Sequence, residues 1–365
     1  MTRVHIDIPQ EHPYDVIIEA GCLQDLGKEL KALGIASQVM IITDEEVSRR
    51  YLSDAKGSLE QAGYRVSVIT VPSGEEAKST ECAAEIWSAM AECGLTRDSV
   101  VVALGGGVVG DLAGFTASTY MRGLRVVQVP TTLLSMVDSS VGGKTAINLD
   151  QGKNLVGTFC QPILVCADST VLSSLPEREW ACGCGEIIKS AVIDSEDFFF
   201  WLTYHAQDLH DRVPAVVEEA IARCVRFKAS VVVRDKEETA GIRECLNYGH
   251  TLAHAIEAYA GYGVYSHGHA VAQGMRFAAR LSAGLRQGDL EWVTAQDQLL
   301  DALELPEIPL KAPAEDLLAL MKVDKKVRQG RLRFVLPSSC GEWQVQELDD
   351  DVVLEYLQAW VSSHA

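Results

Sequence analysis

Short runs that are rich in apolar residues recur through the first half of the chain. They lie at residues 38–43, 65–71, 99–104, 124–129 and 163–167, and segments of helical character separate them. Runs of this length that are rich in β-branched residues are typical of strands buried on both faces of a parallel sheet. Their alternation with helices predicts an α/β domain built on a Rossmann-like, mostly parallel sheet.

The ends of the chain differ from this middle part. Residues 4–8 alternate between apolar and polar, and after Pro13 a second strand-like segment covers residues 14–19, which predicts an opening hairpin. From Glu177 to about Val323 apolar residues recur three and four positions apart, so this half is predicted to be helical until a strand at Arg331–Leu336. Leu175 and Pro176 mark the boundary between an α/β domain, residues 1–175, and an all-α domain, residues 176–365.

Composition narrows the function classes. The 365 residues are 47% hydrophobic and 23% charged, as in an ordinary soluble globular protein. A formal net charge of −19 argues against nucleic acids and anionic membrane surfaces as partners, because such partners need a basic face. No apolar run approaches the roughly 18 residues of a membrane helix. The ten cysteines are scattered and no signal peptide precedes them, which favours reduced thiols in the cytoplasm.

A glycine-rich turn follows the strand at residues 99–104. Gly105, Gly107 and Gly110 match the G-x-G-x-x-G spacing, and a predicted helix over residues 108–121 comes next. Such a turn lets backbone N–H groups approach a pyrophosphate, although a turn that merely packs a helix against a sheet has the same spacing. Asp44 also ends a predicted strand, but it precedes the glycines, whereas the ribose-binding acid of an ordinary Rossmann fingerprint follows them by about 20 residues.

Three segments of the helical half carry potential metal ligands. Cys182, Cys184 and Glu186 lie in the first, His250 and His254 in the second, and His267 and His269 in the third. His250 and His254 are four residues apart and so share one helix face. The two thiols favour a closed structural zinc site, whereas a glutamate with two histidines leaves a position open for substrate oxygens. The residues alone leave both alternatives open.

Four polar segments identify a family resemblance. They are Gly114-Phe115, Tyr120-Met-Arg-Gly123, Gln128-Val-Pro-Thr-Thr-Leu-Leu134 and Val137-Asp-Ser-Ser-Val-Gly-Gly-Lys144, of which the last begins a segment expected to be a polar loop up to Asn148. They closely resemble the 3-dehydroquinate synthase family of sugar phosphate cyclases, and the resemblance extends from about Asp44 to Pro337. It implies the dehydroquinate synthase fold, NAD and a divalent metal, zinc or cobalt, as cofactors, and a homodimer.

The resemblance also implies the site residues. It resolves the metal ligands as Glu186, His250 and His267. The residues that it implies along NAD are Asp44, Glu75, Lys78, Gly106, Gly107, Val108, Val109, Gly110, Asp111, Thr131, Thr132, Asp138, Lys144, Lys153, Asp168 and Thr170. The residues that it implies for substrate binding and catalysis are Arg122, Lys144, Asn154, Lys189, Lys228, Arg243, Asn247, His254 and Lys325, with Arg122 reaching the neighbouring subunit. The chain departs from the family pattern at His269, where a glutamate is usual, and at Gly185, where an alanine is expected.

The implied substrate is 3-deoxy-D-arabino-heptulosonate 7-phosphate, an anionic sugar phosphate. The implied reaction is a transient oxidation at C5 by NAD, loss of phosphate from C7, return of the hydride and an intramolecular aldol closure to 3-dehydroquinate. A related cyclase for another sugar phosphate, a metal-dependent NAD polyol dehydrogenase and a non-catalytic sugar-phosphate sensor are the alternatives. The many Lys and Arg residues of the motifs argue against a neutral polyol, and three open-site metal ligands argue against a sensor.

Overall fold

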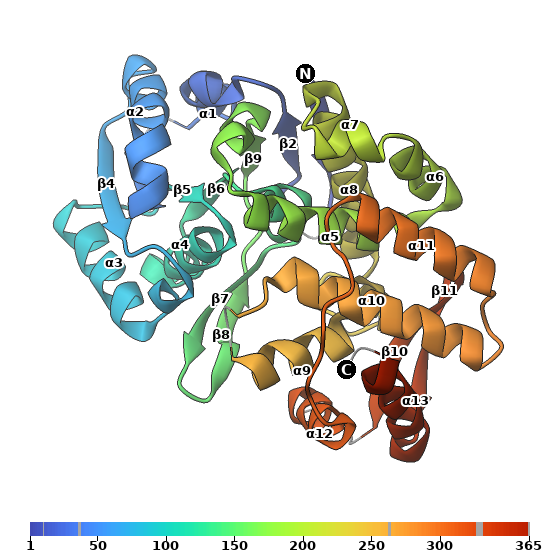
Figure 1. Cartoon of the computed structure of the whole chain (residues 1–365). Helices are drawn as coiled ribbons and strands as arrows, with labels where there is room; N and C mark the ends of the chain where they lie inside the picture. The colour runs from blue at the N-terminus through green and yellow to red at the C-terminus, as the bar shows by residue number, and fades with distance from the viewer. Residues whose placement is uncertain (10, 36–37, 262–263, 326–330, 364–365) are drawn as a thin grey trace. The chain divides into compact units, whose positions relative to one another are not determined.

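A computed structural model describes the chain except for residues 10, 36–37, 262–263, 326–330 and 364–365. Its contacts group the residues into two compact units (Figure 1). The first consists of Met1–Leu175 and Val217–Glu237, and the second of Pro176–Val216 and Glu238–Ala365. Among the described residues, no helix is long and apolar enough to cross a membrane.

The first unit is organised around a seven-stranded sheet. Its strands are β1 (Thr2–Ile6), β2 (Tyr14–Ile18), β3 (Val39–Asp44), β4 (Val66–Val71), β5 (Val100–Gly105), β6 (Arg125–Pro130) and β9 (Leu164–Ala167). They are ordered β1-β2-β9-β6-β5-β3-β4. β1 and β2 form the predicted antiparallel hairpin, and the other neighbours are parallel. The mostly parallel sheet and the opening hairpin are therefore confirmed.

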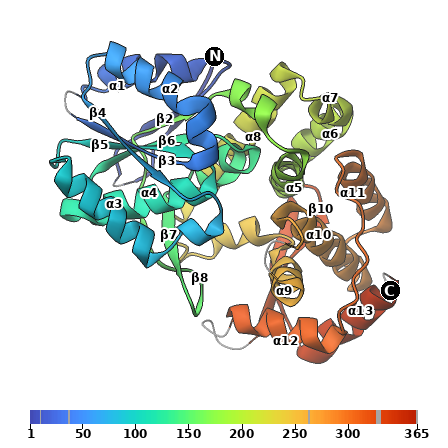
Figure 2. The same ribbon diagram turned by 60° about the vertical axis from the view of Figure 1, so that its left-hand side comes forward.

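Helices cover both faces of this sheet. They are α1 (Leu26–Ala32), α2 (Glu45–Gln61), α3 (Thr80–Glu92) and α4 (Gly107–Thr119). Val39 and Ile41 of β3 belong to one apolar core, together with residues of α1 and α2, whereas Met40 and Ile42 belong to a second core, with residues of α3 and α4. Figure 2 shows these two pairs of helices on opposite sides of the strands. Successive strand residues therefore enter different cores, which explains why residues 39–42 are all apolar.

The segment expected to be a polar loop contains a strand, and this expectation is wrong. β7 (Lys144–Leu149) pairs antiparallel with β8 (Gly152–Phe159) in a separate two-stranded sheet. One face of the hairpin packs on α4, where a Cβ on Gly114 would lie 2.3 Å from Cγ2 of Thr145. Most of β8 is exposed, so its sequence lacks the apolar run that identifies the buried strands.

The second unit is mainly helical, as predicted. Its helices are α5 (Glu177–Asp194), α6 (Glu196–Tyr204), α7 (Ala206–His210), α9 (His250–Ala260), α10 (His267–Gly284), α11 (Leu290–Ala302), α12 (Ala314–Lys325) and α13 (Asp350–Ser363). A hairpin of β10 (Leu332–Ser339) and β11 (Glu342–Leu348) joins them. α8 (Pro214–Arg234) begins in this unit, and most of it belongs to the first unit.

Two glycines let α5 and α10 approach each other closely. A Cβ on Gly268 would lie 2.4 Å from Cα of Cys182, and a Cβ on Gly185 would lie 3.2 Å from Cα of Gly268. The contact at Gly268 therefore excludes any side chain, and that at Gly185 is tight even for a methyl group. Glu186 and His267 are the immediate neighbours of these glycines, so the close approach of the two backbones brings both side chains to one place.

Candidate functional site

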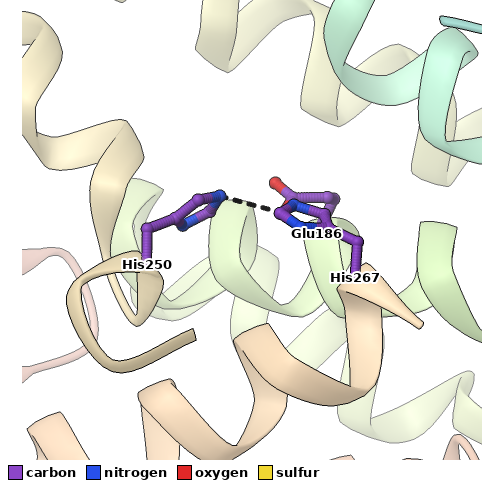
Figure 3. A group of neighbouring side chains, drawn as sticks. All are labelled: Glu186, His250 and His267. Carbon is purple, nitrogen blue, oxygen red and sulfur yellow. Dashed lines mark ion pairs between the residues drawn. The ribbon is translucent and has the colours of Figure 1, made fainter. Parts of the chain in front are cut away.

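Three side chains of the second unit form a candidate metal centre. Glu186 lies on α5, His250 is the first residue of α9, and His267 is the first residue of α10. Each offers one ligand atom, and these atoms lie within 4.8 Å of one another (Figure 3). Nε2 of His250 and Nε2 of His267 are each 3.6 Å from Oε1 of Glu186. This is the ligand set that the resemblance implies.

The carboxylate of Glu186 lies in a setting that favours a bound cation. Its side chain is only 2% exposed, and neither oxygen has a hydrogen-bond partner in the described part of the chain, although Lys189 forms an ion pair with it. Burial raises a carboxyl pKa, but Lys189 and the two imidazoles hold the pKa of Glu186 well below its usual value. A buried carboxylate that stays ionised needs positive charge beside it. A divalent cation bound between this carboxylate and the Nε2 atoms of His250 and His267 would supply that charge.

The two histidines differ in their protonation. Burial lowers the pKa of His250 to about 3, and the nearby Lys189 and His267 add to this effect. Burial also disfavours the charged form of His267, but the neighbouring carboxylates of Glu186 and Glu257 raise its pKa to about 10. In the metal-free protein the positive charge beside Glu186 therefore includes a proton on His267. His250 is neutral, as a metal ligand must be.

The two thiols and His269 do not join this centre. Cys182 and Cys184 are buried, and burial raises the pKa of Cys182 to about 12 and that of Cys184 further. Nδ1 of His269 lies 2.7 Å from Oγ of Ser266, the residue that caps α10. Among the described residues, the group with metal-binding geometry is the glutamate with two histidines. The closed thiolate site is therefore the weaker of the two alternatives.

Other residues predicted for the site also belong to the second unit. The ring of His254 lies 5.5 Å from that of His250, centroid to centroid, one turn further along α9. Arg243 is 1% exposed, and its Nε lies 3.6 Å from Oε1 of Glu238. Asn247 is exposed at the end of the turn before α9. Lys325 is the last residue of α12, and its side chain lies outside the described part of the structure.

Three predicted residues of the first unit meet at one buried lysine. Nζ of Lys78, which is 4% exposed, donates to Oδ2 of Asp111 at 2.6 Å and to Oδ1 of Asn154 at 2.5 Å. Glu75 lies 3.8 Å from the same Nζ. Burial raises the pKa of Asp111 and outweighs the opposing effect of Lys78. Asn148, which no sequence motif assigns to the site, donates to Glu75 at 2.8 Å and accepts from the backbone of Asn154 at 2.9 Å.

A second charged pair lies beside the glycine turn in the same unit. Lys228 of α8 is buried, and its Nζ lies 2.9 Å from Oδ1 of Asp138 and donates to the backbone oxygen of Asp138 at 2.7 Å. Lys144 and Lys153 lie on β7 and β8 and are exposed. Arg122 has a positive φ of 70°, as Met121 does with 49°, in the turn that follows α4.

In the glycine turn, no side chain caps the N–H groups of the first turn of α4. Gly106 is its N-cap and makes no side-chain cap, and Val108 and Val109 are in the first turn. A Cβ would lie 3.0 Å from Thr132 at position 106, 3.1 Å from Ser139 at position 107 and 2.9 Å from Gln128 at position 110. The hydroxyl of Thr131 is buried without a hydrogen-bond partner among the described residues. Uncapped N–H groups on a helix of this length are a suitable site for a phosphate.

Two predicted carboxylates already have partners within the unit. Oδ1 of Asp44 caps α2 through the N–H groups of Glu46 and Val47, and it also accepts from Ser73. Asp168 is 3% exposed and accepts from Gly21 and Leu23 as well as from the N–H and hydroxyl of Thr170. Asp168 therefore fastens the turn after β2 to the end of β9.

Comparison with known proteins places these features in a family. The family models for the N-terminal and C-terminal parts of 3-dehydroquinate synthase match residues 68–182 and 183–327. The chain is 51% identical to the 3-dehydroquinate synthase of Rhodopirellula baltica, with 85% of this chain and 83% of that protein covered. It is 42% identical to that of Desulforamulus reducens, with 94% and 95% covered.

A solved structure agrees with this result. A crystal structure of 2-deoxy-scyllo-inosose synthase complexed with carbaglucose-6-phosphate, NAD⁺ and Co²⁺ is 26% identical, with a TM-score of 0.88 and coverage of 98% of this chain and 100% of that one. The fold and the candidate metal centre thus define an enzyme of the sugar phosphate cyclase class. The chain belongs to the 3-dehydroquinate synthase family.

Proposed function

We propose that the chain converts 3-deoxy-D-arabino-heptulosonate 7-phosphate to 3-dehydroquinate and phosphate, with NAD and one divalent cation as cofactors. The observation that carries this proposal is the Glu186, His250 and His267 cluster in a chain whose relatives are 3-dehydroquinate synthases. A non-catalytic sensor has no use for three converging ligands with an open position. A second cyclase activity is less favoured, because identity to the named 3-dehydroquinate synthases is 42–51%, against 26% to the inosose synthase.

The metal would be held by Glu186 and by Nε2 of His250 and His267. The fit rests on the ionised, buried carboxylate, whose oxygens have no hydrogen-bond partner among the described residues. Three protein ligands leave room for substrate oxygens, as in catalytic zinc sites. A divalent cation bound here would supply Lewis acidity that lowers the pKa of the substrate hydroxyls. Glu186 and Lys189 form the ion pair that holds the carboxylate in place.

NAD would lie along the residues of the first unit. The fit rests on the uncapped start of α4 and on positions 106, 107 and 110, where even a methyl group would be in tight contact with the side chain of Thr132, Ser139 or Gln128. When bound, NAD would supply a hydride acceptor. We assign to this site Asp44, Glu75, Lys78, Gly106, Gly107, Val108, Val109, Gly110, Asp111, Thr131, Thr132, Asp138, Lys144, Lys153, Asp168 and Thr170. Within this set, Lys78 orients Asp111, and Asp168 acts by holding the loop at Gly21.

Cationic and amide side chains would bind the two anionic ends of the substrate. We assign to this role Arg122, Lys144, Asn154, Lys189, Lys228, Arg243, Asn247, His254 and Lys325. Ion pairs hold several of these groups before substrate arrives, as between Lys228 and Asp138 and between Arg243 and Glu238. Preorganised charges of this kind orient a substrate and stabilise charge that develops in the transition state.

The assembly and the compartment are part of the same proposal. A homodimer in which Arg122 reaches the partner's substrate follows from the family resemblance, and the positive φ of Arg122 shows that its turn adopts an unusual conformation. A cytoplasmic location is supported by the ten cysteines, all of which are free thiols.

Anaerobic incubation with the heptulosonate phosphate and a catalytic amount of NAD tests the function. Phosphate release in excess of NAD, without growth of the NADH absorbance band, is the expected result, because the hydride returns to the substrate. Sustained NADH accumulation would instead identify a dehydrogenase. Phosphate release without a cyclic product would show that the chain eliminates phosphate but does not complete the synthase reaction.

A further inference from the structure

One face of α9 carries three polar side chains. His250, His254 and Glu257 are spaced by four and three residues, which places them in one row along the helix. The proposed function uses the first two. The side chain of Glu257 is 14% exposed, so its carboxylate is largely removed from water and needs a partner there.

One such partner is His267, the second histidine of the metal centre. Oε1 of Glu257 lies 3.4 Å from Nδ1 of His267, and Nε2 of the same ring lies 3.6 Å from Oε1 of Glu186. The imidazole of His267 therefore stands between two carboxylates, one at each nitrogen. When the ring is neutral, an Nδ1–H directed at Glu257 leaves the lone pair on Nε2, the nitrogen nearer to Glu186, and this is the tautomer that a metal requires.

The other histidine has a different outer partner. Nδ1 of His250 lies 3.1 Å from the backbone oxygen of Tyr248, so a neutral carbonyl fixes its tautomer. A carboxylate partner also makes a ring more basic, whereas a carbonyl does so less. The two imidazoles of the centre are thus made unequal by their second hydrogen bonds.

We propose that Glu257 is a positioning residue that orients His267 and strengthens it as a metal ligand. This inference rests on the proposed metal centre. Glu257 acts through the ring of His267 and does not itself bind the cation. Loss of such an outer carboxylate costs about 10- to 100-fold in metal affinity. A role confined to fastening α9 to α10 would lower stability and leave metal affinity unchanged.

Co²⁺ binding to the metal-stripped full-length protein separates these roles. The dissociation constant is measured by competition with a chromophoric chelator, and the visible absorption of bound Co²⁺ reports the ligand geometry. For Glu257→Ala we expect about a 10- to 100-fold rise in the dissociation constant. Glu257→Gln keeps an oxygen acceptor and loses the charge, so we expect a smaller rise, about 3- to 10-fold, and a folded protein.

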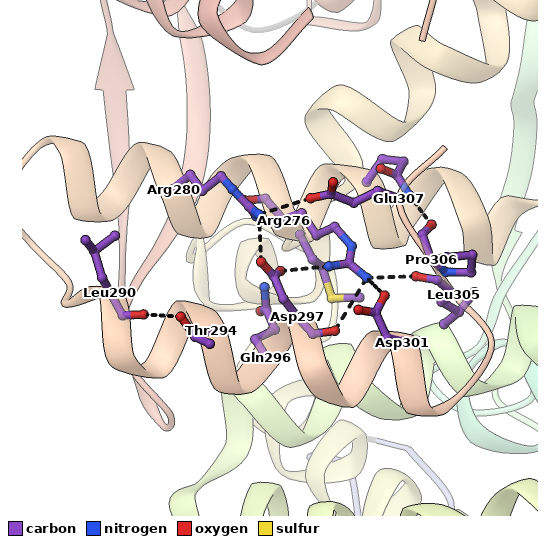
Figure 4. Close-up of polar contacts among 12 residues, drawn as sticks. Arg276, Arg280, Leu290, Thr294, Gln296, Asp297, Asp301, Leu305, Pro306 and Glu307 are labelled. Carbon is purple, nitrogen blue, oxygen red and sulfur yellow. Dashed lines mark hydrogen bonds and ion pairs between the residues drawn. The ribbon is translucent and has the colours of Figure 1, made fainter. Parts of the chain in front are cut away.

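Asp297→Asn is a matched control. Its side chain is 17% exposed and pairs with Arg276 at 3.1 Å and with Arg280 at 2.7 Å, in a network of α10 and α11 that contains no metal ligand (Figure 4). We expect this variant to lower the melting temperature and to leave the Co²⁺ dissociation constant unchanged. His267→Ala is the second control, and we expect it to abolish tight binding.

The possible outcomes test the role of Glu257 separately from the proposed metal centre. If His267→Ala weakens Co²⁺ binding and both Glu257 variants bind like the wild type, the positioning role is overturned and the metal centre stands. If His267→Ala binds Co²⁺ like the wild type, the metal centre itself is wrong. Equal losses of affinity in Glu257→Gln and Asp297→Asn would show a general effect of stability, which also overturns the inference.

Discussion

The carbonyl oxygen of Gly249 lies where a side chain at position 274 would begin. A Cβ on Gly274 would be 1.8 Å from that oxygen, and Gly249 itself has a φ of 79°. Gly274 of α10 thus leaves space for the turn that ends at His250, the first residue of α9. The position of His250 therefore depends on the presence of glycine, without a side chain, at position 274 of the neighbouring helix.

Gly274→Ala should displace this turn. We expect a loss of about 1–3 kcal/mol in the free energy of unfolding, as in other overpacked cores, and weaker Co²⁺ binding through the shifted His250. Thermal denaturation and Co²⁺ titration measure the two effects. Gly57→Ala in α2 is the control, since a Cβ there meets no atom within 4 Å. A helix-interior alanine at that open position should instead stabilise the protein by about 0.5–1 kcal/mol. Wild-type behaviour of Gly274→Ala would show that the turn tolerates the methyl group.

Removal of the metal should abolish activity. We expect a chelator to stop phosphate release and Zn²⁺ or Co²⁺ to restore it, because Glu186, His250 and His267 leave a ligand position open. A variant in which both Cys182 and Cys184 are changed to Ala should still bind about one metal ion per chain, because neither thiol belongs to the cluster. Metal analysis of the purified variants decides the point. Loss of metal in the double variant, with retention in His250→Ala, would assign the site to the thiols.

A surface carboxylate should make the stability of the first unit sensitive to acid. Burial alone raises the pKa of Asp15, but His5 and Arg3 lower it overall, at distances of 2.7 Å and 2.9 Å. A carboxyl whose folded pKa is lowered stabilises the protein above its ordinary value of 3.8, and this stabilisation is lost as the pH falls through the folded pKa.

Asp15→Asn tests this pH dependence. We expect the variant to lose up to about 1 kcal/mol of unfolding free energy at pH 7, as for a partly exposed ion pair, and the difference to shrink as the pH falls below 3.8. Urea denaturation at several pH values measures it. Asp7→Asn, at an exposed position of the same segment, should change little. A difference between Asp15→Asn and the wild type that stays constant with pH would contradict the assignment to ionisation.

The sequence predicts the elements whose environment is uniform along their length. β3 and β5 were predicted because residues on both of their faces enter apolar cores. β8 was missed because most of it is exposed, and β7 because its buried part is confined to residues 145–147, so neither strand carries a long apolar run. Helical periodicity also shows that α8 has an apolar face but does not show which core it joins, and residues 217–237 have their contacts with the first unit.

The candidate site shows the same division. The spacing of His250 and His254 correctly predicts a shared helix face, yet the second histidine of the metal cluster is His267 of another helix. That grouping depends on the approach of α5 and α10 at Gly185 and Gly268, and no local pattern encodes this approach. Glu257 could have been found from its spacing, seven residues after His250, whereas the carbonyl of Tyr248 carries no signal in the sequence.

The proposed dimer makes a prediction about mixed subunits. Arg122 lies in the turn after α4, and the proposal places it at the substrate of the partner, whereas Lys144 serves its own subunit. Arg122→Ala and Lys144→Ala should each be inactive as homodimers. In a mixed dimer, the site of the Arg122→Ala subunit has its own Lys144 and receives the wild-type Arg122 from the partner. The other site lacks both residues.

Co-expression of the two variants with different affinity tags tests this directly. Random pairing makes about half of the dimers mixed, with one complete site each, so roughly a quarter of wild-type activity should return in the mixture and roughly half in the doubly purified mixed dimer. The control is a mixture of Lys144→Ala with Asn154→Ala, both placed in the same subunit's site, which should recover nothing. A doubly tagged dimer of Arg122→Ala and Lys144→Ala without activity would show that Arg122 acts within its own chain or has no part in the reaction.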